Sequence, residues 1–210
     1  MRAVFLDRDG VISENRADHV KSWEEFCFIP GALTALRWLH EAGLQTFIVT
    51  NQAIINRGII ASEVLEDIHA RMALRVVESG GFIDDIRYCP HDQRENCQCR
   101  KPRPGMLSAL AAKWNVDLSQ SYIVGDAWTD IAAGRAAHCR TIMVCTGRGT
   151  EHMQLCETYQ NPADHIAADL LDAVNWIFDQ EGIAAAYQER KGLNTRLTNA
   201  AWQAALSVAG

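Results

Sequence analysis

The chain has 210 residues and a formal net charge of −6, with 48% hydrophobic and 22% charged residues. This composition is typical of a globular protein with one main domain and a short appendage. The acidic balance argues against a large nucleic-acid interface, and no run reaches the roughly 18 apolar residues of a membrane span. Asp7 follows the N-terminus too closely for a secretory signal, so we expect a cytoplasmic protein.

Strand-like segments recur along most of the chain. Short, largely apolar runs predict strands at residues 3–6, 46–49, 86–88, 122–124 and 141–144. Runs of this kind indicate strands that are buried on both faces of a sheet.

Segments with helical spacing fill the intervals between these strands. Leucines at every third residue lead to a stop at Gly43, Ser62 is predicted to cap a second helix, and Pro104 to open a third. A fourth helix is expected after Thr129 and a fifth over residues 170–178. The second helix is predicted to bury one apolar face, formed by Val64, Leu65, Ile68, Met72 and Val76.

The alternation of strand and helix predicts an α/β fold with a central parallel sheet covered on both faces. In such sheets, ligands bind beyond the carboxyl ends of the strands. The composition changes near Ile183. We therefore expect a main domain over residues 1–182 and a C-terminal extension over residues 183–210, helical or partly disordered.

Two aspartates follow the first predicted strand. Asp7 and Asp9 lie on the same side of an extended chain, where one can attack phosphorus and the other can serve as acid and base. Gly10 allows the chain to turn away next to a substrate. The plainer interpretation is that acidic residues only end the strand. A calcium loop begins with the same spacing, but Val11 and Ile12 occupy the positions of its next acid and its glycine.

Two other strand ends carry polar groups suited to phosphate. Thr50, Asn51 and Gln52 offer a hydroxyl and two amides for phosphate oxygens, with a helix cap at Thr50 as the alternative. Asp126 ends the fourth strand region and lies beside Asp7 if the two strands are neighbours. The two carboxylates would then offer oxygen ligands to Mg²⁺.

A second set of metal-ligating residue types lies in a polar segment after the third strand. Cys89, His91, Cys97 and Cys99 have the spacing of a closed tetrahedral Zn²⁺ site, over residues 89–99, of the structural kind. Buried thiols beside a surface histidine are the alternative. The remaining cysteines are expected to be packing residues: Cys27, Cys139, Cys145 and Cys156.

Four motifs resemble those of the haloacid dehalogenase-like (HAD) phosphatases. The matching residues are Asp7 and Asp9 with Gly10-Val11, Thr50, Lys101, and Gly125-Asp126 followed by Asp130. The resemblance implies a three-layer Rossmann-like HAD fold and, because no large insertion separates the motifs, no separate cap domain. We expect a monomer whose partner is a small phosphorylated metabolite, not a nucleic acid or a membrane.

The resemblance assigns a role to each matched residue. Asp7 would be the nucleophile, and Asp9 the general acid and base, with its backbone carbonyl also contacting Mg²⁺. Asp126 would complete the Mg²⁺ site, with Asp130 as a supporting carboxylate. The phosphoryl group would be stabilised by Thr50 and Lys101.

The zinc segment runs directly into Arg100-Lys101-Pro102, which is similar to the D-glycero-D-manno-heptose-1,7-bisphosphate 7-phosphatase subfamily. Histidinol-phosphate phosphatases share this loop, but four segments fit the heptose branch better, at residues 28–31, 50–52, 57–58 and 146–147. The resemblance implies hydrolysis of the heptose 7-phosphate, with histidinol phosphate or another sugar phosphate as the alternative. The substrate-binding residues would be Asn51, Gln52, Arg57 and Arg100.

The chain departs from the subfamily pattern in three places. Ala53-Ile54 stand in place of Ser-Gly, Asp18-His19-Val20 in place of Gly-Tyr-Val, and Ala127 in place of a lysine. Two of these positions are where sugar or phosphate would be held.

A non-enzymatic alternative is a zinc-based module that binds nucleic acid or protein through its local basic residues, Arg94, Arg100, Lys101 and Arg103.

Overall fold

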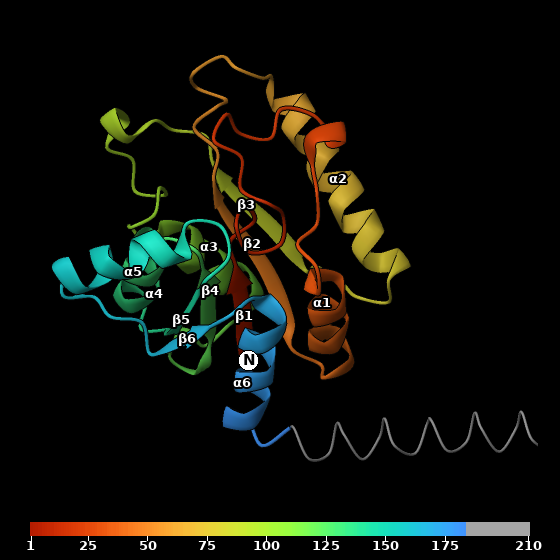
Figure 1. The fold of residues 1–210 in the computed structure, drawn as a ribbon, viewed down its shortest axis with the longest axis vertical. Helices are drawn as coiled ribbons and strands as arrows, with labels where there is room; N and C mark the ends of the chain where they lie inside the picture. The colour runs from red at the N-terminus through yellow and green to blue at the C-terminus, as the bar shows by residue number, and fades with distance from the viewer. Residues whose placement is uncertain (184–210) are drawn as a thin grey trace, which may run out of the picture. The chain divides into compact units, whose positions relative to one another are not determined.

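The computed structural model describes residues 1–183 (Figure 1). Its centre is a six-stranded sheet in the order β3-β2-β1-β4-β5-β6, in which every neighbouring pair is parallel. The strands are β1 (Ala3–Leu6), β2 (Gln45–Asn51), β3 (Asp85–Cys89), β4 (Tyr122–Gly125), β5 (Arg140–Val144) and β6 (His165–Ala167). All residues of β1 and β4 are buried, as expected for strands with a layer on each side.

Helices alternate with these strands along the chain. The α-helices of the described residues are α1 (Ala32–Glu41), α2 (Ser62–Glu78), α3 (Gly105–Trp114), α4 (Trp128–Ala136), α5 (Gly149–Thr158) and α6 (Leu170–Gln180). The 3-10 helices are η1 (Trp23–Glu25), η2 (Gln93–Glu95) and η3 (Leu118–Gln120). The predicted α/β class is confirmed. Only η1 lies between β1 and α1, and only η2 between β3 and α3, so the described residues contain no inserted cap domain.

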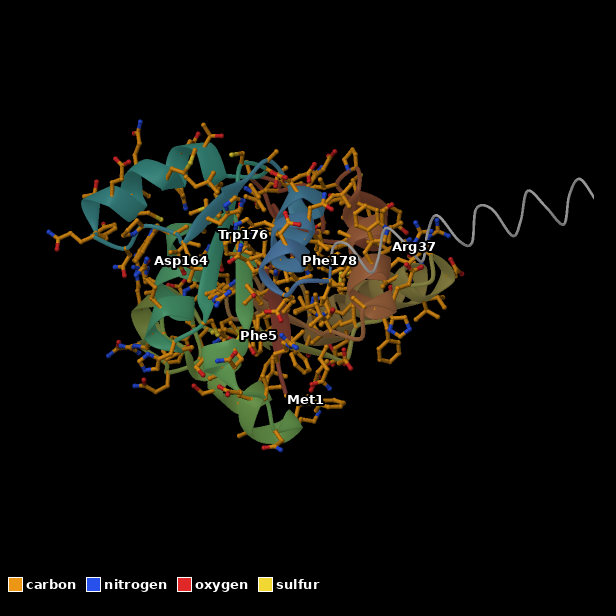
Figure 2. The ribbon with its side chains drawn as sticks, turned by 90° about the horizontal axis from the view of Figure 1, so that it is seen from below. Met1, Phe5, Arg37, Asp164, Trp176 and Phe178 are labelled. Carbon is orange, nitrogen blue, oxygen red and sulfur yellow. The ribbon has the colours of Figure 1, made fainter. Side chains whose placement is uncertain are left out.

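Helices cover both faces of the sheet. On one face, Phe5 and Phe47 pack against Leu107 and Leu110 of α3 and Ala133 of α4, and the two phenyl rings lie 5.4 Å apart. Figure 1 shows α1 and α2 on the other side of the sheet, and Figure 2 shows Phe5 in the interior. The strands are therefore held from two sides, which fixes the positions of their carboxyl ends.

Several local features differ from the sequence prediction. The patterns do not reveal β6, which has only three residues, or α5, which has no sustained apolar face. Ser62 does not cap α2, because the cap position is Ala61 and the Ser62 hydroxyl donates to the Glu63 carboxylate instead. Val64 is 38% exposed, whereas it was expected on the buried face of this helix.

The chain divides into a compact unit of Met1–Val174 and a second unit that begins at Asn175. Nearly all of the predicted extension over residues 183–210 lies outside the described residues. Among the described helices, none has the length and apolar character required to cross a membrane.

Candidate active site

The carboxyl ends of three neighbouring strands meet at one edge of the sheet. Leu6 of β1 is paired with Ile48 of β2 and with Val124 of β4. Because β1 and β4 are neighbours, Asp7 and Asp126 emerge side by side, as the sequence argument required. Thr50, at the end of β2, lies on the other flank of Asp7.

A buried lysine links two of the carboxylates. Lys101 Nζ lies 3.1 Å from Asp7 Oδ1 and 2.5 Å from Asp130 Oδ1. It also donates to the carbonyl of Val49 at 2.6 Å. Burial opposes the charge of Lys101, but the two carboxylates outweigh this effect and raise the pKa of Lys101 above its usual value. Lys101 is therefore a fixed cation beside Asp7.

Asp7 presents one free oxygen to this site. Its Oδ1 accepts from the Arg8 backbone N–H at 2.8 Å and forms an ion pair with Lys101. Its Oδ2 has no hydrogen-bond partner among the described residues. Burial raises the pKa of Asp7 to about 6, although the charge of Lys101 partly offsets this effect.

The carboxylates form a group that fits a hard cation. Asp7, Asp126 and Asp130 each bring an oxygen within 4.8 Å of the others. Asp126 Oδ2 accepts from the Arg148 backbone N–H at 2.9 Å, but Asp126 Oδ1 is buried without a partner. An unpaired carboxylate oxygen in this position is costly unless a cation neutralises it, and Mg²⁺ prefers such oxygen ligands. Asp130 is already engaged by Lys101, which suits the supporting place predicted for it.

The carboxylate of Asp9 belongs to a different set of contacts. The fully buried Arg8 donates to it through Nε and Nη2 at 2.8 to 3.1 Å. Gln52 Nε2 and Ser13 Oγ also donate to it, at 2.8 and 3.1 Å. Burial acts to raise the pKa of Asp9, but Arg8 and these hydrogen bonds hold it below its usual value. The carboxylate of Asp9 is thus engaged by protein donors. The Mg²⁺ contact expected of Asp9 is through its backbone carbonyl oxygen, and this contact stays a prediction.

Three polar residues at the end of β2 support the neighbouring groups. Thr50 is part of the strand, so it does not cap a helix, and its Oγ1 accepts from Gln52 Nε2 at 2.9 Å. Gln52 is buried and donates to Asp9 and Thr50, and the substrate contact expected of it stays a prediction. Asn51 holds the backbone of Lys101 through two hydrogen bonds of 3.1 Å.

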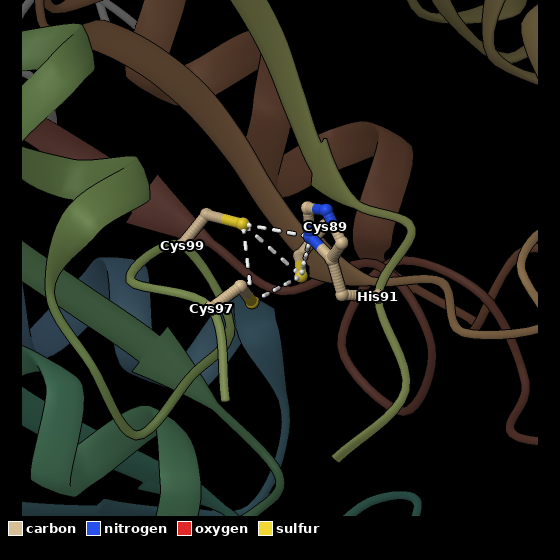
Figure 3. A group of neighbouring side chains, drawn as sticks. All are labelled: Cys89, His91, Cys97 and Cys99. Atoms are coloured by element: carbon tan, nitrogen blue, oxygen red, sulfur yellow. Dashed lines mark hydrogen bonds between the residues drawn. The ribbon is translucent and has the colours of Figure 1, made fainter. Parts of the chain in front are cut away.

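The four predicted zinc ligands converge on one point (Figure 3). Cys89, Cys97 and Cys99 have mutual Sγ separations of 3.3 to 3.6 Å, and His91 Nδ1 lies 3.2 Å from Cys99 Sγ. Zn–S bonds of 2.3 Å in a tetrahedron place two sulfurs about 3.8 Å apart. The donor set and its spacing therefore fit a closed zinc site.

A cavity of about 710 Å³ is lined in part by Asp7 and Asp9. Its volume is in the range of sites for small molecules. Asp7 and Asp9 are its acidic lining residues, and the cationic residues of its wall outnumber them: Arg16, Arg57, Arg100, Lys101, Arg103 and Arg148. This cationic wall, in a chain with a net charge of −6, favours an anionic ligand.

The zinc segment forms part of the wall of this cavity through Asn96 and Cys97. The predicted substrate ligands Arg57 and Arg100 also line it, and both contact the segment. Arg57 Nε lies 2.7 Å from Asp92 Oδ2, and Arg100 donates to the His91 carbonyl at 3.1 Å.

Sequence reasoning did not identify one wall of the cavity. Trp128 at the start of α4, Arg148 immediately before α5, and His152 of α5 line the cavity near Asp126. The weak signal for α5 in the sequence explains the omission. The conspicuous local signal is Thr146-Gly147-Arg148 directly after β5, since turns at strand ends often carry functional side chains.

Comparison with known proteins places this arrangement in a class. A family model described as HAD-hydrolase-like matches residues 98–173. The structure of a D,D-heptose 1,7-bisphosphate phosphatase from B. bronchiseptica, complexed with magnesium and phosphate, superposes with a TM-score of 0.81 and 32% identity. That match covers 86% of this chain and 99% of the other. The fold is that of a HAD-like hydrolase.

Sequence comparison with named proteins identifies the family within this class of hydrolases. A D-glycero-beta-D-manno-heptose-1,7-bisphosphate 7-phosphatase of Pseudomonas aeruginosa is 42% identical over 146 residues, covering 70% of this chain and 82% of the relative. One from Neisseria meningitidis is 35% identical over 177 residues, covering 79% and 95%. The chain belongs to the D-glycero-beta-D-manno-heptose-1,7-bisphosphate 7-phosphatase family, whose members are phosphoric monoester hydrolases.

Proposed function

We propose that this protein is a Mg²⁺-dependent phosphatase that removes the 7-phosphate of D-glycero-D-manno-heptose 1,7-bisphosphate. The observation that carries the proposal is the state of Asp7. One of its oxygens is fixed by Lys101 and Arg8, and the other has no partner among the described residues at the floor of a cationic cavity. A carboxylate held in this way is suited to in-line attack on phosphorus.

In the proposed reaction, Asp7 Oδ2 forms a bond to phosphorus while the bond from phosphorus to the sugar oxygen breaks. Asp9 enters this step in its protonated form, which Arg8 disfavours, and gives that proton to the departing sugar oxygen. Asp9 then takes a proton from water, which attacks the aspartyl-phosphate, releases phosphate and restores Asp7. Lys101 and the Thr50 hydroxyl stabilise the charge on the transferring group.

A Mg²⁺ ion held by Asp7 and Asp126 would supply positive charge that offsets repulsion between carboxylates and phosphate. The buried, unpartnered Oδ1 of Asp126 supports this assignment. We assign a structural Zn²⁺ to Cys89, His91, Cys97 and Cys99, because these four ligands leave no open coordination position.

The assignment of the substrate rests on the named relatives and on the charge of the cavity. A bisphosphate carries a second anionic group, and Arg57 and Arg100 line the cavity on the side of the zinc segment. We propose that these two residues bind the part of the substrate that is not hydrolysed. We further propose that residues 1–182 form the phosphatase domain and that the protein acts as a cytoplasmic monomer.

A phosphate-release assay tests the proposal. The panel comprises heptose 1,7-bisphosphate, a sugar monophosphate and histidinol phosphate, each with and without Mg²⁺. We expect the heptose bisphosphate to have the highest kcat/KM, and Asp7→Asn to abolish turnover. The matched control is Asp67→Asn, since Asp67 is an exposed residue on α2. Undiminished turnover by Asp7→Asn would disprove the nucleophilic role, and a preference for histidinol phosphate would replace the substrate assignment.

A further inference from the structure

The ammonium group of Lys101 is already engaged by protein oxygens. It donates to the Val49 carbonyl at 2.6 Å and forms ion pairs with Asp7 Oδ1 at 3.1 Å and Asp130 Oδ1 at 2.5 Å. A phosphate oxygen that approaches Lys101 therefore competes with two carboxylates for its positive charge. A transferring phosphoryl group has three equatorial oxygens, so a further charged donor can act beside Lys101, the Thr50 hydroxyl and the proposed Mg²⁺.

Most of the other cavity cations are engaged away from the catalytic carboxylates. Their acceptors belong to the zinc segment or to the surface: Arg57 with Asp92, Arg100 with the His91 carbonyl, Arg103 with Asn96 and Cys97, and Arg16 with Asp18.

Arg148 differs from these arginines in its surroundings. Its only side-chain acceptor among the described residues is Asp126 Oδ2, at 3.4 Å from Nε. The side chain is 45% exposed and lines the cavity, and its charge interacts with Asp126, Asp7 and Asp130. The guanidinium thus has free donors in a cavity that Asp7 also lines.

The turn before α5 fixes the position of the Arg148 backbone beside Asp126. Thr146 Oγ1 donates to the Gly10 carbonyl at 2.6 Å, and a Cβ on Gly147 would lie 2.4 Å from Asp126 Oδ2. The Arg148 backbone N–H holds that same carboxylate oxygen at 2.9 Å. Asp126 therefore keeps a partner if the guanidinium turns from its weak 3.4 Å contact to a ligand.

We propose that Arg148 is a catalytic residue that contacts the oxygens of the transferring phosphoryl group from the side of Asp126. This inference rests on the proposed reaction at Asp7 and assigns it a second cation. The residue after Asp126 is the uncharged Ala127, so the cation on this side of the site comes from the turn after β5 instead. Arginine suits the role because its planar fork can donate two parallel hydrogen bonds to phosphate.

The test compares Arg148→Gln and Arg148→Lys with Arg135→Gln. Arg135 is a control on α4 that pairs with Asp164 and does not line the cavity. Calorimetry measures the Kd of inorganic phosphate at saturating Mg²⁺ and, separately, the Kd of Mg²⁺ without phosphate. We expect Arg148→Gln to weaken phosphate binding at least tenfold and to lower kcat/KM about 10²- to 10³-fold. Arg148→Lys should restore part of both, and Arg135→Gln should match the wild type.

An unchanged phosphate Kd in Arg148→Gln at saturating Mg²⁺ would overturn the inference. A change confined to the Kd of Mg²⁺ would also overturn it, because Arg148 would then only position Asp126. Thermal unfolding of each variant verifies that the fold is retained. The phosphate measurement needs no turnover, so it decides the role of Arg148 even if the heptose bisphosphate proves not to be the substrate.

Discussion

Arg8 and Asp9 are consecutive in the chain, yet their side chains form a two-pronged ion pair. Arg8 Nη2 lies 2.8 Å from Asp9 Oδ2, and Nε lies 3.1 Å from Asp9 Oδ1. The remaining arm, Nη1, lies 3.0 Å from His69 Nε2. Because a guanidinium can only donate, His69 must accept at Nε2 and is neutral with its hydrogen on Nδ1. The proposed acid and base is thus held by a buried chain of three side chains.

This chain of contacts predicts a pH dependence of stability. Burial and the charge of Arg8 lower the pKa of His69 to about 3. Between about pH 3 and 6.5 the unfolded chain therefore binds more protons at this residue than the folded protein does. The contribution of neutral His69 to the free energy of unfolding is therefore complete above pH 6.5. Below that pH it is lost at about 1.4 kcal/mol per pH unit as the pH falls. Asp9, with a lowered pKa, loses its contribution only at lower pH.

We expect His69→Gln to remove this loss, since the glutamine amide oxygen can accept from Arg8 without titrating. Denaturant unfolding from pH 4 to 7 in Mg²⁺-free buffer checks the prediction. His40→Gln is the control, because His40 is exposed on α1. A pH profile for His69→Gln that superimposes on that of the wild type would show that His69 is not the neutral partner of Arg8.

Asp7 is expected to have the opposite effect on stability. Its pKa is raised to about 6, mainly by burial. Between about pH 4 and 6 the folded protein holds the proton at this residue more tightly than the unfolded chain, so stability falls as the pH rises. We expect Asp7→Asn to be more stable than the wild type by about 1 to 3 kcal/mol at pH 7 without Mg²⁺.

The two effects oppose each other over nearly the same pH range, which sharpens the measurement. The pKa values of the neighbouring Asp126 and Asp130 are also raised by burial, so each variant is compared with the wild type rather than by its own slope. Relative to the wild type, stability should increase more steeply with pH in Asp7→Asn and decrease more steeply with pH in His69→Gln. Changes of slope of the same sign in both variants would contradict the assignment. Mg²⁺ should stabilise the wild type but not Asp126→Asn.

The sequence predicts the parts of this site that depend on strand ends. Asp7 and Asp126 follow buried apolar runs, and parallel pairing of β1 with β4 is enough to bring them together. The convergence of the Cys and His cluster is predictable because all four residues lie within one short segment. The roles of His69 and Arg148 are not predictable in this way. His69 reaches Arg8 only through the packing of α2 against the sheet. Arg148 depends on a turn before α5, a helix whose sequence has no sustained apolar face.

The zinc segment should stabilise the cavity wall. We expect the wild type to contain one equivalent of zinc and Cys97→Ser to lose it, together with about 3 kcal/mol of stability. Substrate affinity should also fall, because Asn96 and Cys97 line the cavity. Cys27→Ser is the control, since Cys27 lies outside the zinc cluster and is exposed, contrary to the packing position predicted for it. Elemental analysis and thermal unfolding provide the readouts, and zinc retained by Cys97→Ser with unchanged stability would argue against the site.

Gly10 controls the position of Asp126, and its replacement should separate metal binding from folding. Gly10 has a φ of +89°, and a Cβ there would lie 2.2 Å from Asp126 Oδ2. Gly10→Ala must therefore displace this carboxylate, so we expect Mg²⁺ affinity to fall at least tenfold and stability by about 1 to 3 kcal/mol.

Gly43→Ala is a matched control for this substitution. Gly43 has a similar φ of +72°, but a Cβ there meets nothing within 4 Å. It should therefore impose a comparable backbone strain while leaving the carboxylates in place. Calorimetric titration with Mg²⁺ should show normal affinity for Gly43→Ala and weakened affinity for Gly10→Ala. Equal Mg²⁺ affinities in the two variants would mean that the contact between Gly10 and Asp126 does not determine metal binding, and that Asp126 is not an essential ligand at its observed position.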